Sequence, residues 1–455
     1  MHLPFLLLGL SAISAASIPN ANHIFNAIHS SMRQWGSSLN HNGMSFFLAS
    51  VPAGTRLYHG SSHRDTLRHI GWMAFDPEHA LVFARPPRVP VNVNDAQQPL
   101  SQSTENAGWL HTYETTRDIR LVYIDGLSGG KSRIGTLDSQ DRILFNDTLP
   151  PGGVGLESQR AEAVCRIASE EWNGRIDGVI RMAAGFEIIL CAPEDNLAML
   201  EVNKAKMAHQ QSRKKPKSGK PGELMRVVTS RYDGIGGDRA VVNYDHFVTA
   251  YDSDLDLFAG STMPRLNHLP LSCLQRIRQR LTEMAMHHKN GHTNWQAIAD
   301  MTVKQYGRRL RDLVSRFTTI ETLSAEISRI WASYRDLDRS NLADEVERCA
   351  TRFLPGVPKS SIAYRAVYSI NERICSDLAS VLYEDSFDAA ILRLLELMDY
   401  LGWSVWKECQ DCPDDAFCAI PIWPQGTVED HEHPRCQPFD SAYDGASDYW
   451  GLVWH

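Results

Sequence analysis

The sequence has 455 residues, of which 43% are hydrophobic and 22% are charged, and its formal net charge is -8 at pH 7. This length allows two or three domains, and the composition is that of an ordinary globular protein, which excludes a wholly disordered chain. The negative charge argues against a general nucleic-acid binder. No apolar run beyond the N-terminal segment is long enough to span a bilayer.

The N-terminal segment, residues 1–17, has the pattern of a signal peptide. An apolar run over residues 4–10 is followed by small residues, with Ser14 and Ala16 at the positions that a signal peptidase recognises. The pattern predicts a secreted, extracellular chain whose mature form begins near residue 17; the alternative is a buried N-terminal helix. Secretion would also make Asn146, in the sequence Asn-Asp-Thr, a glycosylation site on a surface loop.

Periodic patterns predict the elements that follow. Apolar residues recur at helical spacing from Ile24 to Trp35, where Gly36 ends the pattern, and a second apolar stripe runs along residues 160–172. Runs of β-branched and aromatic residues predict strands of a mixed or antiparallel sheet. The expected strands cover residues 56–58, 72–75, 109–113 and 120–124, and a later strand carries Glu187.

Three of these segments carry short motifs. The first strand stops at His59-Gly60-Ser61, where a glycine would let another molecule approach the backbone. The second strand leads into a helix for which Asp76 is a suitable N-cap. The strand with Glu187 runs into an Ala-Pro-Glu turn. Together these motifs resemble the nucleotide half-site of the ADP-ribosyltransferase fold, in the branch whose first strand ends in His-Gly-Ser or His-Gly-Thr.

The resemblance covers roughly residues 50–200, and it implies that the protein takes NAD as a substrate, with no metal. His59 would bond a ribose hydroxyl, the backbone of Gly60 would hold the nicotinamide amide, and Ser61 completes the motif. Glu187 would bond the same ribose and stabilise the oxocarbenium-like centre that forms when the nicotinamide bond breaks. A fixed negative charge on a rigid strand favours such a developing positive charge.

One position departs from the family pattern. The family's second strand usually carries a tyrosine or serine against the nicotinamide, and here that strand reads Trp72-Met-Ala-Phe75. Either aromatic ring could stack on the ligand, or both could belong to a plain core strand.

The expected function is NAD-dependent ADP-ribosyl transfer to an unknown protein or small molecule, or NAD glycohydrolysis. The alternative is a non-catalytic extracellular binding or cell-wall protein on a degenerate version of the fold, in which His59 only caps a strand and Glu187 faces solvent. A glycosidase with paired carboxylates also stays open, since such pairs have no local sequence signature.

Residues 125–132 raise a separate phosphate-binding hypothesis. This stretch follows a strand and contains three glycines before Lys131, but Asp125 stands where a P-loop requires a glycine. A turn is the better interpretation.

The second half of the chain differs in composition. Residues 204–226 are basic and rich in proline and glycine, which predicts a linker between an α+β domain, residues 18–203, and a mainly helical domain, residues 227–405. We expect a solvated hinge, with a processing site or a tether to an anionic surface as alternatives.

The tail, residues 406–455, is acidic and holds four of the nine cysteines. In an oxidising compartment the default is disulfides, with zinc as the alternative for Cys409 and Cys412 together with nearby histidines. The odd number of cysteines leaves at least one thiol free or paired between chains. The order of signal peptide, long domain and cysteine-rich end also resembles uncharacterised secreted proteins of filamentous fungi.

Overall fold

The computed structural model describes residues 18–86, 107–149, 154–206, 227–287, 291–339, 341–409, 411–438 and 449–451. These residues form two compact units. The described residues of 26–297 and 403–455 make up the sheet unit, and those of 1–25 and 298–402 make up the helical unit. Helices and a large mixed sheet are both present, so the fold is α+β, as expected. Within the described ranges, no helix has the length and apolar character needed to cross a membrane.

The sheet unit is built on a sheet with the strand order β8-β4-β2-β3-β7-β6-β5-β1-β9. Only the β5–β6 pair is parallel among the neighbouring strands described. The strands are β1 (Ser45–Val51), β2 (Arg56–Ser61), β3 (Gly71–Ala74), β4 (Gly108–Thr115), β5 (Ile119–Ile124), β6 (Gly178–Met182), β7 (Phe186–Leu190), β8 (Leu197–Ala205) and β9 (Val241–Thr249).

The two strands at the centre of this order have a common feature. Both β6 and β7 are buried over their whole length, which is why their sequences are nearly unbroken apolar runs. Their two charged residues, Arg181 and Glu187, lie opposite each other in the register. Charge in such a buried place is expensive unless it is paired, so this pair marks a site that needs a functional or structural explanation.

Strand β9 follows the stretch where the sequence predicts a linker. The structure describes the first part of that stretch as the end of β8, and residues 207–226 lie outside the described residues. Although β9 was expected to lead into the helical domain, it pairs with β1 at the edge of the sheet.

The single helix expected from Ile24 to Trp35 is wrong, because the chain forms α1 (Ala21–Ser30) and α2 (Gln34–Leu39) instead. Met32 adopts a left-handed conformation, with φ of 55°, and its N–H donates to the hydroxyl of Tyr123 at 3.2 Å. Gly36 lies inside α2 and does not end it. A Cβ at this position would lie 2.4 Å from the Ser30 hydroxyl oxygen, so only glycine lets the two helices pack this closely.

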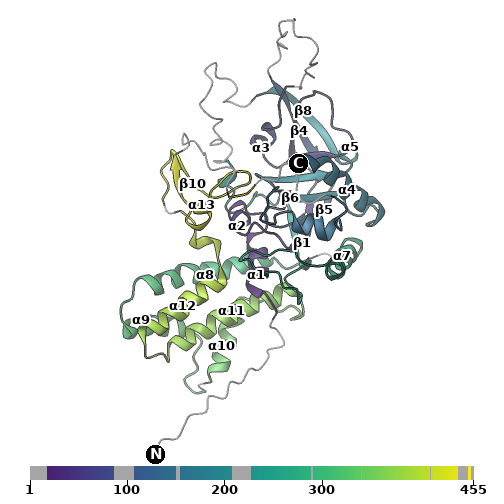
Figure 1. The fold of residues 1–455 in the computed structure, drawn as a ribbon. Helices are drawn as coiled ribbons and strands as arrows, with labels where there is room; N and C mark the ends of the chain where they lie inside the picture. The colour runs from purple at the N-terminus through teal and green to yellow at the C-terminus, as the bar shows by residue number, and fades with distance from the viewer. Residues whose placement is uncertain are drawn as a thin grey trace, which may run out of the picture. The chain divides into compact units, whose positions relative to one another are not determined.

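Further helices of the sheet unit are α3 (Pro77–Leu81), α4 (Glu157–Glu170), α5 (Pro193–Asn196) and α7 (Leu271–Met286). Helix α4 packs on β6, and a disulfide between Cys165 and Cys191 joins it to the end of β7 (Figure 1). Asp76 precedes α3 but its side chain makes no cap hydrogen bond. Asp76 is thus at the expected N-cap position, but its carboxylate forms an ion pair with Arg231 instead of capping the helix.

The helical unit contains α9 (Ile320–Trp331), α10 (Leu342–Ala350), α11 (Ile362–Val381) and α12 (Phe387–Leu401), together with most of α8 (Trp295–Ser315). Helix α11 contacts α9, α10 and α12, and these helices run alongside one another in Figure 1. A side chain of the type that favours helix starts caps four of them: Thr319, Asn341, Ser361 and Ser386. The disulfide Cys349–Cys375 joins α10 to α11.

The tail contributes a small hairpin of β10 (Ala416–Ala419) and β11 (Arg435–Pro438) and the short helix α13 (Val428–Glu432). Its apolar side chains, among them Phe417 and Ile422, pack around Trp35 of the same unit. Because the aliphatic content of the tail is low, we expected packing on the helices to hold it; the described contacts place it on the sheet unit.

Candidate functional site

A cavity of about 420 Å³ opens beside β2, β3 and β7 in the sheet unit. Its volume lies in the range of small-molecule sites in proteins. Four of the residues singled out from the sequence line it, His59, Gly60, Trp72 and Glu187. They come from three strands. The resemblance implies that the strand ending at His59 and the strand carrying Glu187 lie side by side; this expectation is wrong, because β3 lies between them.

His59 lies where β2 and β3 part. The described residues of these strands pair at one position, Tyr58 with Ala74. Just beyond it, Nδ1 of His59 lies 2.8 Å from the carbonyl oxygen of Trp72. Since a carbonyl oxygen can only accept, Nδ1 carries the proton. Burial lowers the pKa of His59 below its usual value, so the ring is neutral at pH 7 and Nε2 is left with a lone pair that can accept a hydroxyl proton.

Glu187 does not face solvent. The residue is 7% exposed, and one carboxylate oxygen accepts a hydrogen bond from Nε of Arg181 at 2.8 Å. Arg181 is fully buried and also donates to the side-chain oxygen of Gln140 at 3.1 Å and to the carboxylate of Glu157. One planar guanidinium therefore holds both carboxylates, each through a single charge-assisted hydrogen bond.

Glu157, at the start of α4, places a second carboxylate in the cavity. Burial favours its neutral form, but the positive charges of Arg181 and Lys131 outweigh burial and lower the pKa of Glu157 to about 2. Both Arg160 and Lys131 also pair with it, at 3.2 Å and 3.4 Å. Glu157 is therefore ionised at any physiological pH and cannot donate a proton to a leaving group.

Trp423 brings the tail into the same cavity. Its ring lies 4.7 Å from the ammonium of Lys131, a distance at which a cation is attracted to the face of an aromatic ring. Strands, a turn, a helix start and the tail all contribute residues to the lining of the cavity.

Two of the expected site residues do not line the cavity. Ser61 ends β2 outside it, and Phe75 is 1% exposed, with the guanidinium of Arg239 at 5.8 Å from its ring. Of the two aromatic candidates, Trp72 is therefore the one that reaches the cavity. Gly60 is also constrained from within: a Cβ there would lie 2.0 Å from the carbonyl oxygen of Ala80, so the missing side chain makes room for α3.

The N-terminal part of the chain matches a family model. A family model described as the YPL277C N-terminal domain matches residues 11–91 and 86–215, which is less than half of the chain and contains every strand that lines the cavity.

Two proteins of Saccharomyces cerevisiae, named uncharacterized proteins YPL277C and YOR389W, are each 27% identical to this chain, over 198 and 197 residues. Each match covers 38% of this chain, and it covers 40% of YPL277C and 31% of YOR389W. The chain therefore spans less than half the length of these relatives. No solved structure matches it.

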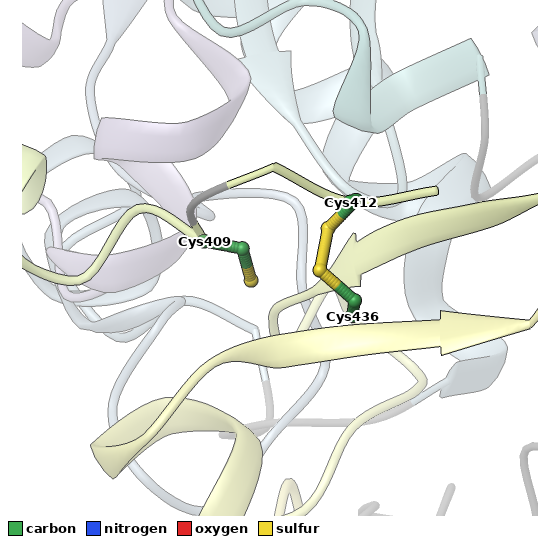
Figure 2. A group of neighbouring side chains, drawn as sticks. All are labelled: Cys409, Cys412 and Cys436. Carbon is green, nitrogen blue, oxygen red and sulfur yellow. A yellow bond between two sulfur atoms is a disulfide. The ribbon is translucent and has the colours of Figure 1, made fainter. Parts of the chain in front are cut away.

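The cysteines confirm the expectation of disulfides. The tail contains the disulfides Cys409–Cys418 and Cys412–Cys436, and Cys273 is the one free cysteine among the described residues. The Sγ atoms of Cys409, Cys412 and Cys436 lie within 4.8 Å of one another. Figure 2 shows the sulfur–sulfur bond between Cys412 and Cys436. Since their sulfurs are bonded to other sulfurs, they are not available as thiolate ligands, which removes the zinc alternative for this cluster.

Sequence reasoning missed the charged side of the cavity. Lys131 was assigned to a turn, and the chain does turn there, but the turn delivers the ammonium to the cavity. Arg181 and Glu157 each carried a local signal. Arg181 is a charge inside an apolar strand, and Glu157 is an acidic residue at a helix start. Trp423 carried none, because nothing local indicates which distant surface a tail residue covers.

Proposed function

We propose that the cavity binds NAD and supports cleavage of the bond between nicotinamide and ribose, with the ADP-ribosyl group passed to water or to an acceptor. The observation that carries this proposal is the convergence of His59, Gly60, Trp72 and Glu187 on one cavity from three strands. The resemblance to the ADP-ribosyltransferase fold assigns His59, Gly60 and Glu187 to the same ligand. Trp72 stands on the strand where the family usually has a tyrosine or serine against the nicotinamide.

The charges of the cavity suit this bond better than an ordinary glycosidic bond. In NAD the leaving group is a pyridinium, so the electron pair of the broken C–N bond neutralises it and nicotinamide departs without a proton. Water then adds to the ribose carbon and releases one proton to solvent. An O-glycoside needs a general acid, and the ionised Glu157 cannot serve as one.

The neutral residues have roles that follow from their contacts. His59 presents the lone pair of Nε2 to a ribose hydroxyl because Nδ1 is held by the carbonyl oxygen of Trp72. The indole of Trp72 offers a flat apolar surface for the nicotinamide ring. Glu187, held by Arg181, provides a fixed negative charge at the ribose carbon where positive charge develops.

The four disulfides support an extracellular setting for this reaction, since such bonds persist in oxidising compartments. The signal-peptide pattern of residues 1–17 supports the same setting. We therefore place the proposed activity in a secreted protein.

A non-catalytic binding protein is the second candidate, and one contact favours it. Arg181 already neutralises part of the charge on Glu187, at 2.8 Å, which weakens the field that the carboxylate can apply to a developing cation. The replacement of the family's tyrosine or serine by Trp72 favours the same alternative.

Release of nicotinamide from NAD by the purified full-length protein tests the proposal. Glu187→Gln keeps the shape and removes the charge, and we expect it to lower the rate by about 100-fold to 1,000-fold, the loss of about 2.7–4 kcal/mol that follows removal of one electrostatic group. Glu201→Gln changes an exposed glutamate on β8 and serves as the matched control.

The result separates the two candidates. Turnover by the wild type and the Glu201→Gln variant, but not by the Glu187→Gln variant, supports the enzyme. Binding of NAD without turnover supports the binding protein. Equal turnover in all three would place the chemistry away from Glu187.

A further inference from the structure

Lys131 has an unusual position for a lysine. It follows the turn after β5 and is 5% exposed, although lysine side chains normally reach water. Its ammonium lies at the cavity, and burial lowers the pKa of Lys131 below its usual value. The charges of Glu157 and Glu187 oppose this effect, and the charge of Arg181 adds to it.

The ammonium has fewer partners than it can use. An ammonium carries three N–H donors. Within the described residues, its contacts are one carboxylate, Glu157 at 3.4 Å, and the ring of Trp423 at 4.7 Å. Glu157 is shared with Arg160 and Arg181, so Lys131 holds only part of that charge. A buried donor without a full set of acceptors is costly, and a ligand that brings an acceptor would remove the cost.

The turn that delivers Lys131 is rigid. Gly126 adopts φ of 64°, and Gly129 N–H donates to the carbonyl oxygen of Met182 at 2.7 Å, which fastens the turn to the end of β6. The hydroxyl of Ser128 donates to the carbonyl oxygen of Ile124 at 2.8 Å. The turn therefore holds the ammonium at a fixed point of the cavity, as a binding contact needs to be held.

We infer that Lys131 is the phosphate-recognising residue of the cavity, so that the ligand is a nicotinamide nucleotide and not the phosphate-free nucleoside. This inference rests on the proposed function for the nicotinamide part only. This site differs from a P-loop, because its contact with phosphate would come from one ammonium and not from a row of backbone N–H groups. Trp423 keeps the ammonium in place by covering it from the tail side.

Phosphate fits this position better than a carboxylate or a hydroxyl. The ribose carbon would lie near Glu187, and a 5′-phosphate is the nearest anionic group of the ligand. Its strong acceptor oxygens suit a donor that is already desolvated. A hydroxyl would bring no negative charge to the ammonium, and a 5′-phosphate brings three strong acceptor oxygens where a carboxylate brings two.

The test compares two probes that differ by one phosphate, nicotinamide mononucleotide and nicotinamide riboside. Their affinities are measured by calorimetry on the full-length protein in a Glu187→Gln background, so that neither is consumed. Lys131→Met should weaken binding of the mononucleotide by about 10-fold to 100-fold and binding of the riboside by less than about threefold, as expected for one charge-assisted hydrogen bond.

Two variants serve as controls. Lys131→Arg keeps the charge and should preserve the preference for the mononucleotide. Lys204→Met removes another lysine that lies over a tryptophan ring, Trp109 at 5.8 Å, but on exposed β8 outside the cavity, and it should change neither affinity.

The outcomes distinguish this inference from the proposed function. Equal weakening of both probes by Lys131→Met overturns the phosphate role and leaves the NAD proposal standing. If neither nicotinamide compound binds, but inorganic pyrophosphate binds to the wild type and not to Lys131→Met, the phosphate site stands and the NAD proposal fails. Absence of all binding overturns both. Should Lys131→Met not fold, a wild-type preference for the mononucleotide below about threefold overturns the inference.

Discussion

The two sides of the cavity are built in opposite ways. The sheet wall, defined by His59, Gly60, Trp72 and Glu187, comes from three strands, and its residues belong to short motifs. The charged wall, defined by Lys131, Glu157 and Arg181, comes from a turn, a helix start and β6, and no motif joins its members. Local sequence specifies the first wall, whereas tertiary packing alone creates the second.

The two walls should therefore respond differently to substitution, one mainly in stability and the other mainly in binding and turnover. Within the charged wall, Glu157 and Arg181 pair with each other, and Arg181 holds a carboxylate from each wall. Lys131 is the exception, because its ammonium keeps donors for a ligand. Residues of the sheet wall have atoms left over for a ligand, such as Nε2 of His59. We therefore expect changes in the interior of the charged wall to act first on stability, and changes in the sheet wall to act first on binding and turnover.

The largest expected effect is that of Arg181→Met. The change leaves Glu157 and Glu187 buried without their shared cation, and breaking a buried ion pair from one side costs about 3–5 kcal/mol. Urea denaturation followed by tryptophan fluorescence measures the free energy of unfolding of the sheet unit.

The pair Arg117–Asp177, at 2.7 Å, has an arginine side chain that is 44% exposed, and it is the matched control. Arg117→Met should cost less than about 1 kcal/mol, since solvent screens such a pair. Similar losses in the two variants would show that the charged wall is not the structural support proposed.

A second test uses two disulfides that close loops of equal length. Cys165–Cys191 and Cys349–Cys375 each join residues 26 apart, so each should contribute about 3 kcal/mol to the unit that contains it. Only the first joins the helix of Glu157 to the strand of Glu187. The double serine variant of that pair should therefore lose NAD turnover as well as stability.

Replacing Cys349 and Cys375 by serine should destabilise the helical unit and leave turnover unchanged. Nicotinamide release and thermal melting, recorded on the same samples, check both statements. If both pairs reduced turnover alike, the link between α4 and the position of the two carboxylates would be wrong.

Much of the fold could be predicted because the signals are local. The strands ending at His59 and carrying Glu187 are short apolar or β-branched runs, and the four capped helices of the helical unit begin at residues of the expected type. Strand β1, with the sequence Ser-Phe-Phe-Leu-Ala-Ser-Val, was missed because a short run of apolar residues has no clear period.

The rest depended on contacts that sequence spacing does not show. The break after Ser30 follows from the bond between Met32 and Tyr123, which lie on different elements. The sequence around Lys131 indicates only a turn. Its pairing with Glu157 exists only in the folded chain, so the sequence could not show that the turn carries a charge into the cavity. The same holds for Trp423, which lines the cavity although it lies in the tail, C-terminal to every strand of the large sheet.

The packing of the tail should respond to acid. His41 is buried against the rings of His431, Tyr449 and Trp450. Burial, followed by the charges of His431 and Lys407, lowers the pKa of His41 to about 3, against a smaller opposing effect of the Ser38 backbone.

The sign of the effect follows from the two protonation states. Above pH 6.5 His41 is neutral in both the folded and the unfolded chain, so the folded state loses nothing. As the pH falls from 6.5 toward 3, the unfolded chain binds a proton that the folded chain refuses, and stability falls by about 1.4 kcal/mol per pH unit. At pH 5 this contribution amounts to about 2 kcal/mol.

The variant His41→Phe keeps an aromatic ring and removes the titration. Between pH 7 and pH 5, the wild type should lose about 2 kcal/mol more stability than this variant in urea denaturation. His246→Gln, which changes an exposed histidine on β9, should behave like the wild type. Parallel pH curves for the wild type and His41→Phe would show that the tail is not held by a neutral His41.

The smallest effect concerns the two aromatic residues that the sequence could not tell apart. Trp72 lines the cavity, whereas Phe75 is packed under Arg239 in the core. Trp72→Leu should weaken NAD binding by about fivefold, the loss of about 1 kcal/mol of aromatic contact, with little change in stability. Phe75→Leu should cost about 1 kcal/mol of stability through imperfect repacking and leave affinity unchanged. If the sheet wall binds the nicotinamide ring, calorimetry should show an affinity loss in Trp72→Leu alone, and thermal melting should show a stability loss mainly in Phe75→Leu. The same pattern with the roles exchanged, or an affinity loss in neither variant, would place the ring elsewhere and leave Trp72 as a core residue that happens to border the cavity.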